Sequence, residues 1–215
     1  MKLIAMLAAL LLASPLAAQT FDVKLGGKTL GTLSYSAKGG DTTLSSTLDS
    51  TPMGVFNGTF TGSSSAKGQF IGDSKSSRKQ RVVTVDIEQG RATSVEVTPA
   101  DEMTDLSDKS RVPEDVIDPV RTIGAFIAAT GCPPSMRMYD GRRVVTLTPQ
   151  AGKEDGTSLI CPMSYKVVAG PGYLSPLGIS NAKMELLYDM SGEAQTLKEI
   201  KVSSGVFRLK LLRRD

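Results

Sequence analysis

Hydrophobic and polar residues alternate along most of this chain, as they do in strands that bury one face and expose the other. The alternation is clearest in residues 83–87 and resumes in residues 95–97, beyond the Gln89-Gly90 pair. A turn between two alternating runs predicts a hairpin, and one polar face is typical of antiparallel sheet with a solvated side. The pattern therefore predicts a protein built mainly from antiparallel strands.

The same period of two recurs from residue 21 to the end of the chain. Expected strands cover residues 21–25, 30–35, 42–48, 56–60, 83–87, 95–97, 136–139, 143–147, 159–168, 184–190, 196–202 and 207–211. Serine- and glycine-rich stretches at 62–68 and 73–79, and the polar stretch 149–157, are interpreted as loops. Pro162 is expected to break its strand, because proline donates no backbone hydrogen bond.

The stretch from Asp118 to Gly131 departs from this period and predicts the one long helix. Asp118 can accept hydrogen bonds from the first backbone amides of a helix, and Pro119 suits the first helical position. Gly131 is expected to end the helix in a left-handed conformation. The apolar stripe of this helix consists of Val120, Ile123, Gly124 and Ile127, with Phe126 at its margin and Thr122 away from it.

Such a helix is not stable alone in water, so its stripe must rest on the sheet. Because strands precede and follow it in the sequence, a sheet that curves around the helix is the economical packing. The sequence therefore predicts a mainly β fold, in which a curved antiparallel sheet forms an unclosed or half β-barrel around one central α-helix. Residues 99–117 are interpreted as a connector whose acidic side chains are solvated, with one helical turn at residues 113–115.

Residues 1–18 have the pattern of a secretory signal peptide. Lys2 supplies a positive start, residues 3–12 are apolar, and the small residues at 14–18 offer a cleavage site after Ala18. The apolar run is short for a membrane span. We therefore expect an exported, periplasmic protein that does not span the membrane, with residues 19–215 forming a single β-rich domain.

Cys132 and Cys161 are the only cysteines. An even number of cysteines in an exported chain favours a disulfide over a metal site or two free thiols. A redox-active pair is a weaker interpretation, because the two residues lack the Cys-x-x-Cys spacing of reactive thiols. The disulfide would fasten the end of the helix to the strand that carries Cys161.

The composition removes several chemistries. The chain has no histidine, which excludes Ser-His-Asp and Cys-His catalysis and nearly all zinc sites. A serine-lysine or carboxylate pair stays open, but we expect no catalytic residues, no metal and no cofactor. Removing residues 1–18 lowers the formal net charge from +3 to +2, which gives no argument for nucleic-acid binding.

Basic residues nevertheless gather in two places. They are Lys75, Arg78, Lys79 and Arg81, and then Arg208, Lys210, Arg213 and Arg214. Charges of this kind commonly keep sheet edges and tails soluble, and that interpretation is favoured over contact with an anionic partner.

The chain resembles an uncharacterised family of exported bacterial proteins that share a domain of unknown function. The resemblance lies in short segments in a fixed order: 21–27, 30–33, Asp118-Pro119, 139–143, Cys161, Ala169-Gly170 and 205–209. That family is similar in outline to periplasmic lipoprotein carriers, in which helical structure closes the opening of an unclosed antiparallel barrel. The resemblance implies a half-barrel with affinity for acyl chains or an envelope partner, and it implies no catalytic residues.

Three functions follow as hypotheses. The first is non-catalytic binding or carriage of an apolar, lipid-like ligand in the cell envelope, between the concave sheet and the helix. The second is a structural or protein-interaction module of the envelope, and the third is a histidine-free hydrolase. The candidate ligand-contacting residues are Val120, Ile123, Phe126, Ile127, Met184, Leu186 and Tyr188, for all of which ordinary core packing is the alternative.

Overall fold

The structure is a computed structural model that describes residues 18–51, 57–77, 79–172 and 178–214. The expected signal peptide, apart from Ala18, lies outside the described residues, as does Phe56 of the expected strand 56–60.

Strands make up most of the described chain. In order they are β1 (Gln19–Leu25), β2 (Lys28–Lys38), β3 (Asp41–Leu48), β4 (Gly58–Ser64), β5 (Gln69–Ser76), β6 (Gln80–Glu88), β7 (Arg91–Thr98), β8 (Val116–Ile117), β9 (Met136–Tyr139), β10 (Val144–Pro149), β11 (Lys153–Asp155), β12 (Ser158–Ala169), β13 (Asn181–Asp189), β14 (Thr196–Ser204) and β15 (Phe207–Arg213). One α-helix, α1 (Pro119–Ile127), and three short 3-10 turns, η2 (Ala100–Glu102), η3 (Asp105–Ser107) and η4 (Lys109–Arg111), complete the described elements.

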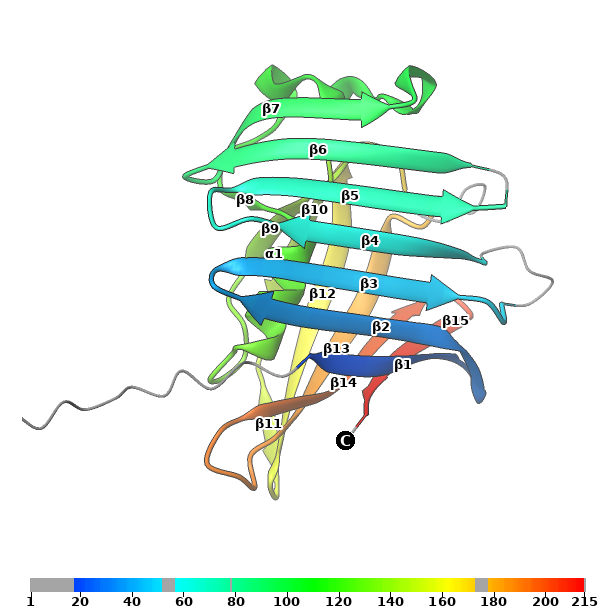
Figure 1. The fold of residues 1–215 in the computed structure, drawn as a ribbon. Coiled ribbons are helices and arrows are strands. Elements are labelled where there is room, and N and C mark those ends of the chain that lie inside the picture. The colour runs from blue at the N-terminus through cyan, green and yellow to red at the C-terminus, as the bar shows by residue number, and fades with distance from the viewer. Residues whose placement is uncertain (1–17, 52–56, 78, 173–177, 215) are drawn as a thin grey trace, which may run out of the picture.

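All of these strands belong to one sheet that curves into a nearly closed barrel. The order is β7-β6-β5-β4-β3-β2-β1-β15-β14-β13-β12-β10-β9-β8, with β11 beside β12, and every pair is antiparallel except β8 with β9. Figure 1 shows β1 to β7 as one layer, with α1 between that layer and the strands β12 to β14, which cross behind it. The predicted mainly β fold around one central helix is confirmed.

The barrel has one seam that strand pairing does not close, between the edge strands β7 and β8. The Val116 amide donates to the Gly90 carbonyl at 3.0 Å across this seam. The turns η2, η3 and η4 pack beside β7. These turns belong to the connector between β7 and β8. The connector therefore covers the edge of β7, whose unpaired backbone groups could otherwise pair with a strand of another molecule.

All three stretches expected as loops contain strand residues: β11 lies within residues 149–157, and glycine explains the error in the other two. Residues 62–64 belong to β4, and residues 73–76 belong to β5. An added Cβ on Gly62 would lie 2.8 Å from Val120 Cγ2 of the helix, and one on Gly72 would lie 2.8 Å from the Phe70 ring. These strands contain glycine because the helix and aromatic rings approach their backbone closely.

The prediction that Pro162 breaks its strand is also wrong. β12 runs through Pro162 because its partner changes there: β10 pairs up to Met163, and β11 begins its pairing at Ile160. The Pro162 carbonyl still accepts from the Gln150 amide at 2.9 Å. The missing proline N–H therefore falls where the neighbouring strand is interrupted, and costs no ladder hydrogen bond.

The connector is less solvated than expected. Residues 113–115 form no helical turn; the three 3-10 turns lie earlier, within residues 100–111. Asp101, Asp105 and Asp108 are exposed as predicted, whereas Glu102 is buried.

The helix begins as predicted and ends earlier. The Asp118 carboxylate accepts from the amides of Val120 and Arg121, and Pro119 occupies the first turn. The helix stops at Ile127 rather than continuing to residue 130, and Gly131 has no left-handed conformation. Thr122 is buried rather than solvent-facing, because strands surround the helix on more than one side.

Replacing Gly62 by alanine should lower the free energy of unfolding by about 1–3 kcal/mol, because the added methyl overpacks a stiff, β-branched side chain. Val120→Ala should cost less stability in the Gly62→Ala protein than in the native protein, since the two residues share one contact. Thr61→Ala, on the exposed face of the same strand, serves as the control and should change stability little. Denaturant unfolding is measured for the native protein, the two single core variants, the double variant and the control; additive effects of the two core substitutions would contradict the contact.

Candidate functional site

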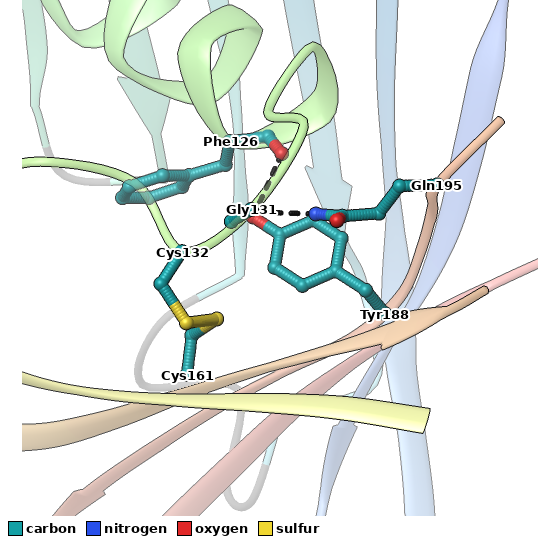
Figure 2. The surroundings of a disulfide bond; sticks show 6 residues. All are labelled: Phe126, Gly131, Cys132, Cys161, Tyr188 and Gln195. Carbon is teal, nitrogen blue, oxygen red and sulfur yellow. Dashed lines mark hydrogen bonds between the residues drawn. A yellow bond between two sulfur atoms is a disulfide. The ribbon is translucent and has the colours of Figure 1, made fainter. Parts of the chain in front are cut away.

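The helix is tied to opposite sides of the barrel at its two ends. At its start, Ser64 Oγ of β4 donates to Asp118 Oδ2 at 2.8 Å, in a buried position. At its end, the Tyr188 hydroxyl of β13 donates to the Phe126 carbonyl at 2.9 Å (Figure 2). Burial raises the pKa of Tyr188, so the hydroxyl remains a donor at neutral pH. These two bonds set the position of the helix within the barrel.

The predicted disulfide is confirmed and holds the segment that follows the helix. Cys132 is bonded to Cys161 of β12, and Figure 2 shows the bond beneath the last turn of the helix. The side-chain amide of Gln195 donates to the Gly131 carbonyl at 3.0 Å beside it. The helix exit is therefore fixed to β12 and to the segment before β14.

The residues proposed as ligand contacts lie together on the helix and on the strand that faces it. Val120, Phe126, Ile127, Met184, Leu186 and Tyr188 are buried in the core, and Ile123 is half-buried. Met184, Leu186 and Tyr188 share the inner face of β13 because strand residues two apart point the same way. Their contact with a ligand stays a prediction; in the structure all seven belong to, or pack against, one hydrophobic core, and Tyr188 of β13 donates to the Phe126 carbonyl of the helix.

Other inward-facing apolar residues are only half-buried. Leu33 lies two residues from Tyr35 on β2, and Phe60 lies two from Gly62 on β4, so both share the face that contacts the helix. On the other side, the Val202–Leu209–Leu25 row continues the cross-strand row of Met184. We name this set the open inner face: Leu25, Leu33, Phe60, Val202, Leu209 and Leu211.

The open inner face spans neighbouring strands from β4 through β1 to β14. Its members are apolar, whereas the outward-facing residues between them, such as Thr61 and Lys210, are polar. Sequence reasoning found the alternation on these strands but could not tell which inward positions the helix covers. The structure adds that α1, nine residues long, covers only part of the inner wall.

A second cluster lies where the connector meets the barrel; the sequence analysis grouped Lys79 and Arg81 as neighbouring basic residues but did not connect them with Glu102 or Arg142. The Glu102 carboxylate receives Lys79 Nζ at 2.7 Å, Arg81 Nη1 at 3.0 Å and Arg142 Nη2 at 3.1 Å. The hydrogen bond from Lys79 contributes most to lowering the pKa of Glu102 to about 2; burial opposes this shift, and Arg81 and Arg142 add to it. The cluster fastens the connector to the start of β6 and to the β9–β10 turn.

The β9–β10 turn itself packs against the inner face of β6. An added Cβ on Gly141 would lie 2.2 Å from Val83 Cγ1, and the turn glycine has a φ of 87°. Thr104 Oγ1 donates to the Arg142 carbonyl at 2.8 Å, and the Tyr139 hydroxyl donates to the Leu106 carbonyl. Side chains and connector thus close the seam that strand pairing leaves open.

Two hollows lie elsewhere in the part of the wall that the structure describes. One, of about 320 Å³, is lined by Asp115, Ile117, Ser135, Met136, Arg137 and Thr146. The other, of about 340 Å³, is lined by Gln150, Pro162, Met163, Lys183, Met184, Glu185, Lys201 and Ser203. Polar and charged groups form much of each lining, so the open inner face suits an apolar ligand better.

Neither a metal site nor a membrane helix emerges from the described ranges. Their cysteine, aspartate and glutamate side chains form no group of three or more that could hold a metal ion. No helix in these ranges has the length and apolar character needed to cross a bilayer.

Reducing the disulfide should destabilise the protein. The bond closes a separation of 29 residues, for which chain entropy gives about 3.6 kcal/mol. A reducing agent should therefore lower the free energy of unfolding of the native protein to about that of Cys132→Ala. Denaturant curves measured with and without reductant test this; a Cys132→Ala protein that still responds to reductant would contradict it.

Acid should weaken the Glu102 cluster. Because the pKa of Glu102 falls from 4.5 in the unfolded chain to about 2 in the fold, its contribution is complete above pH 4.5 and is lost as the pH falls towards 2. Glu102→Gln should lower the free energy of unfolding at pH 7 by about 2–3 kcal/mol and should flatten the acid decline in that range. Unfolding measured at a series of pH values checks this, with exposed Asp101→Asn as the control.

The comparisons with known proteins add no relative. No protein-family model, no curated protein and no solved structure matches this chain. The resemblance to an exported domain family therefore stays a prediction, and the functional argument depends on the geometry of the barrel.

Proposed function

We propose that this protein is an exported, non-catalytic binding protein for an apolar, lipid-like ligand, held in the part of the barrel that the helix leaves uncovered. The observation that carries the proposal is the open inner face. Six inward-facing apolar side chains are half-buried there, although inward positions next to the helix are fully buried. Contact with a ligand's hydrocarbon chain would remove this apolar surface from water, at about 25 cal/mol for each Å².

The arrangement of polar groups supports binding rather than catalysis. The inward-facing groups next to Phe60 are the hydroxyls of Ser46 and Ser74, its two cross-strand partners. Neither serine has a lysine or carboxylate opposite it across the strands: Ser46 pairs with Leu33 and Ser74 with Arg81. An activated nucleophile needs an adjacent base, and arginine stays protonated at any ordinary pH. A hydrophobic wall with a few hydroxyls is typical of a binding site.

The disulfide supports the proposed location. Cys132 and Cys161 are bonded to each other, and disulfides persist in oxidising compartments such as the periplasm. The bond also fixes the helix exit, so the boundary between the filled and the open parts of the interior is rigid. A preformed wall lowers the ordering cost of binding.

A charge on the open inner face should abolish binding of a neutral amphiphile. Phe60→Glu is expected to weaken the binding of monooleoylglycerol at least about tenfold, because a carboxylate would have to be desolvated against the acyl chain. Thr61→Glu is the matched control, since the adjacent residue lies on the outer face of the same strand. Isothermal titration and native mass spectrometry provide the measurement, with thermal unfolding to verify folding. Absence of binding to the native protein, or equal binding by both variants, would refute the proposal.

A further inference from the structure

We propose that the ligand is an amphiphile with an anionic headgroup, and that Lys79 and Arg81 bind that headgroup at the edge of the open inner face, with the more buried Arg142 adding positive charge behind them. The inference rests on the proposed function, because it assigns the class of ligand to the same interior. It starts from an imbalance of charge in the Glu102 cluster. Three cations lie within 3.1 Å of one carboxylate, which leaves a local excess of two positive charges.

The neighbouring charges do not remove this excess. Asp140, the nearest acid on the β9–β10 turn, is matched by Arg143, whose Nε lies 3.1 Å from Asp140 Oδ2. Burial, followed by repulsion from Arg81, lowers the pKa of Arg142, so the cations crowd one another. Three such side chains also carry more N–H donors than one carboxylate can accept. A phosphate or carboxylate group would offset both the charge and the surplus of donors.

The cluster is open to solvent on one side. The Lys79 side chain is 73% exposed and that of Arg81 is 28% exposed, whereas Glu102, beneath them, is 10% exposed. An incoming oxyanion can therefore reach the lysine and the first arginine without displacing Glu102. The buried carboxylate then acts as the group that holds the three cations together.

The register of the sheet connects this cluster to the apolar wall. Phe60 pairs with Ser74, and Ser74 pairs with Arg81, so the three lie in one cross-strand row. Neighbouring strands are about 4.8 Å apart, which puts Arg81 about 10 Å from Phe60 along the row. Arg81 also lies two residues from inward-facing Val83 and so shares its face. A chain lying over Phe60 and Leu33 would bring its headgroup to the cations.

The test compares two ligands that share a chain and a glycerol and differ only in a phosphate: 1-oleoyl-lysophosphatidic acid and monooleoylglycerol. The native protein should bind the phosphate-bearing ligand about tenfold more tightly, because charge-assisted hydrogen bonds add to the chain contacts. Lys79→Gln should remove most of that preference and leave monooleoylglycerol binding unchanged. Lys75→Gln, which removes an exposed lysine from the same end of the sheet, should leave the preference intact.

Salt provides a second measurement that needs no variant. Raising the sodium chloride concentration should weaken binding of the phosphate-bearing ligand and should not weaken binding of the neutral one. Equal affinity for both ligands would overturn this inference and leave the proposed function standing, whereas failure of both to bind would overturn the proposed function as well. Inorganic phosphate that binds as tightly as lysophosphatidic acid would also overturn it, by revealing a site for free anions rather than for an amphiphile.

Discussion

The burial of a helix start inside the barrel is the constraint on which the rest of the structure depends. The first amides of a helix have no partners within it, and a buried amide without a partner is costly. Asp118, which is fully buried, accepts from two of them, while Ser64 of the barrel wall donates to its other oxygen. One carboxylate thus ends the helix and joins it to the sheet. Arg121, whose Nε lies 3.6 Å from Asp118 Oδ2, places a positive charge beside it.

This arrangement dictates the unusual composition of the wall nearest the helix. The backbone of β4 approaches α1 so closely that Gly62 leaves no room for a side chain. Glycine weakens a strand considered alone, and the close helix contact compensates for it. The Tyr188 hydrogen bond and the disulfide then hold the opposite end of the helix. A short helix that could not persist alone in water is therefore fixed from both sides, and it leaves the remainder of the inner wall uncovered.

The seam of the barrel and the proposed ligand site depend on the same charged group. Strand pairing stops at β7 and β8, so apart from the Val116–Gly90 backbone hydrogen bond the connector and the β9–β10 turn join the two edges largely through side chains. Glu102 does so by gathering three cations, and a single carboxylate cannot neutralise three cations. The cluster that joins the two edges therefore carries an excess of positive charge, and this charge lies at the edge of the open inner face. The Glu102 cluster can therefore both close the seam of the barrel and recognise an anionic amphiphile.

Features that depend on residues close together in the chain could be predicted from the amino-acid sequence. Alternation with a period of two predicted most of the strands, Asp118-Pro119 predicted the start of the helix, and an even number of cysteines in a chain expected to be exported predicted the disulfide. The tertiary structure decided the features that depend on residues far apart in the chain. β4 and β5 contain glycines because Val120 and the Phe70 ring lie against their backbones, and this contact exists only in the folded protein. In the sequence, Glu102 looks like any other acidic residue of the connector, because its partner Arg142 lies far along the chain. The same holds for the open inner face: alternation marks Leu33 and Tyr35 as equally inward, and the position of the helix buries Tyr35 fully and leaves Leu33 only partly buried.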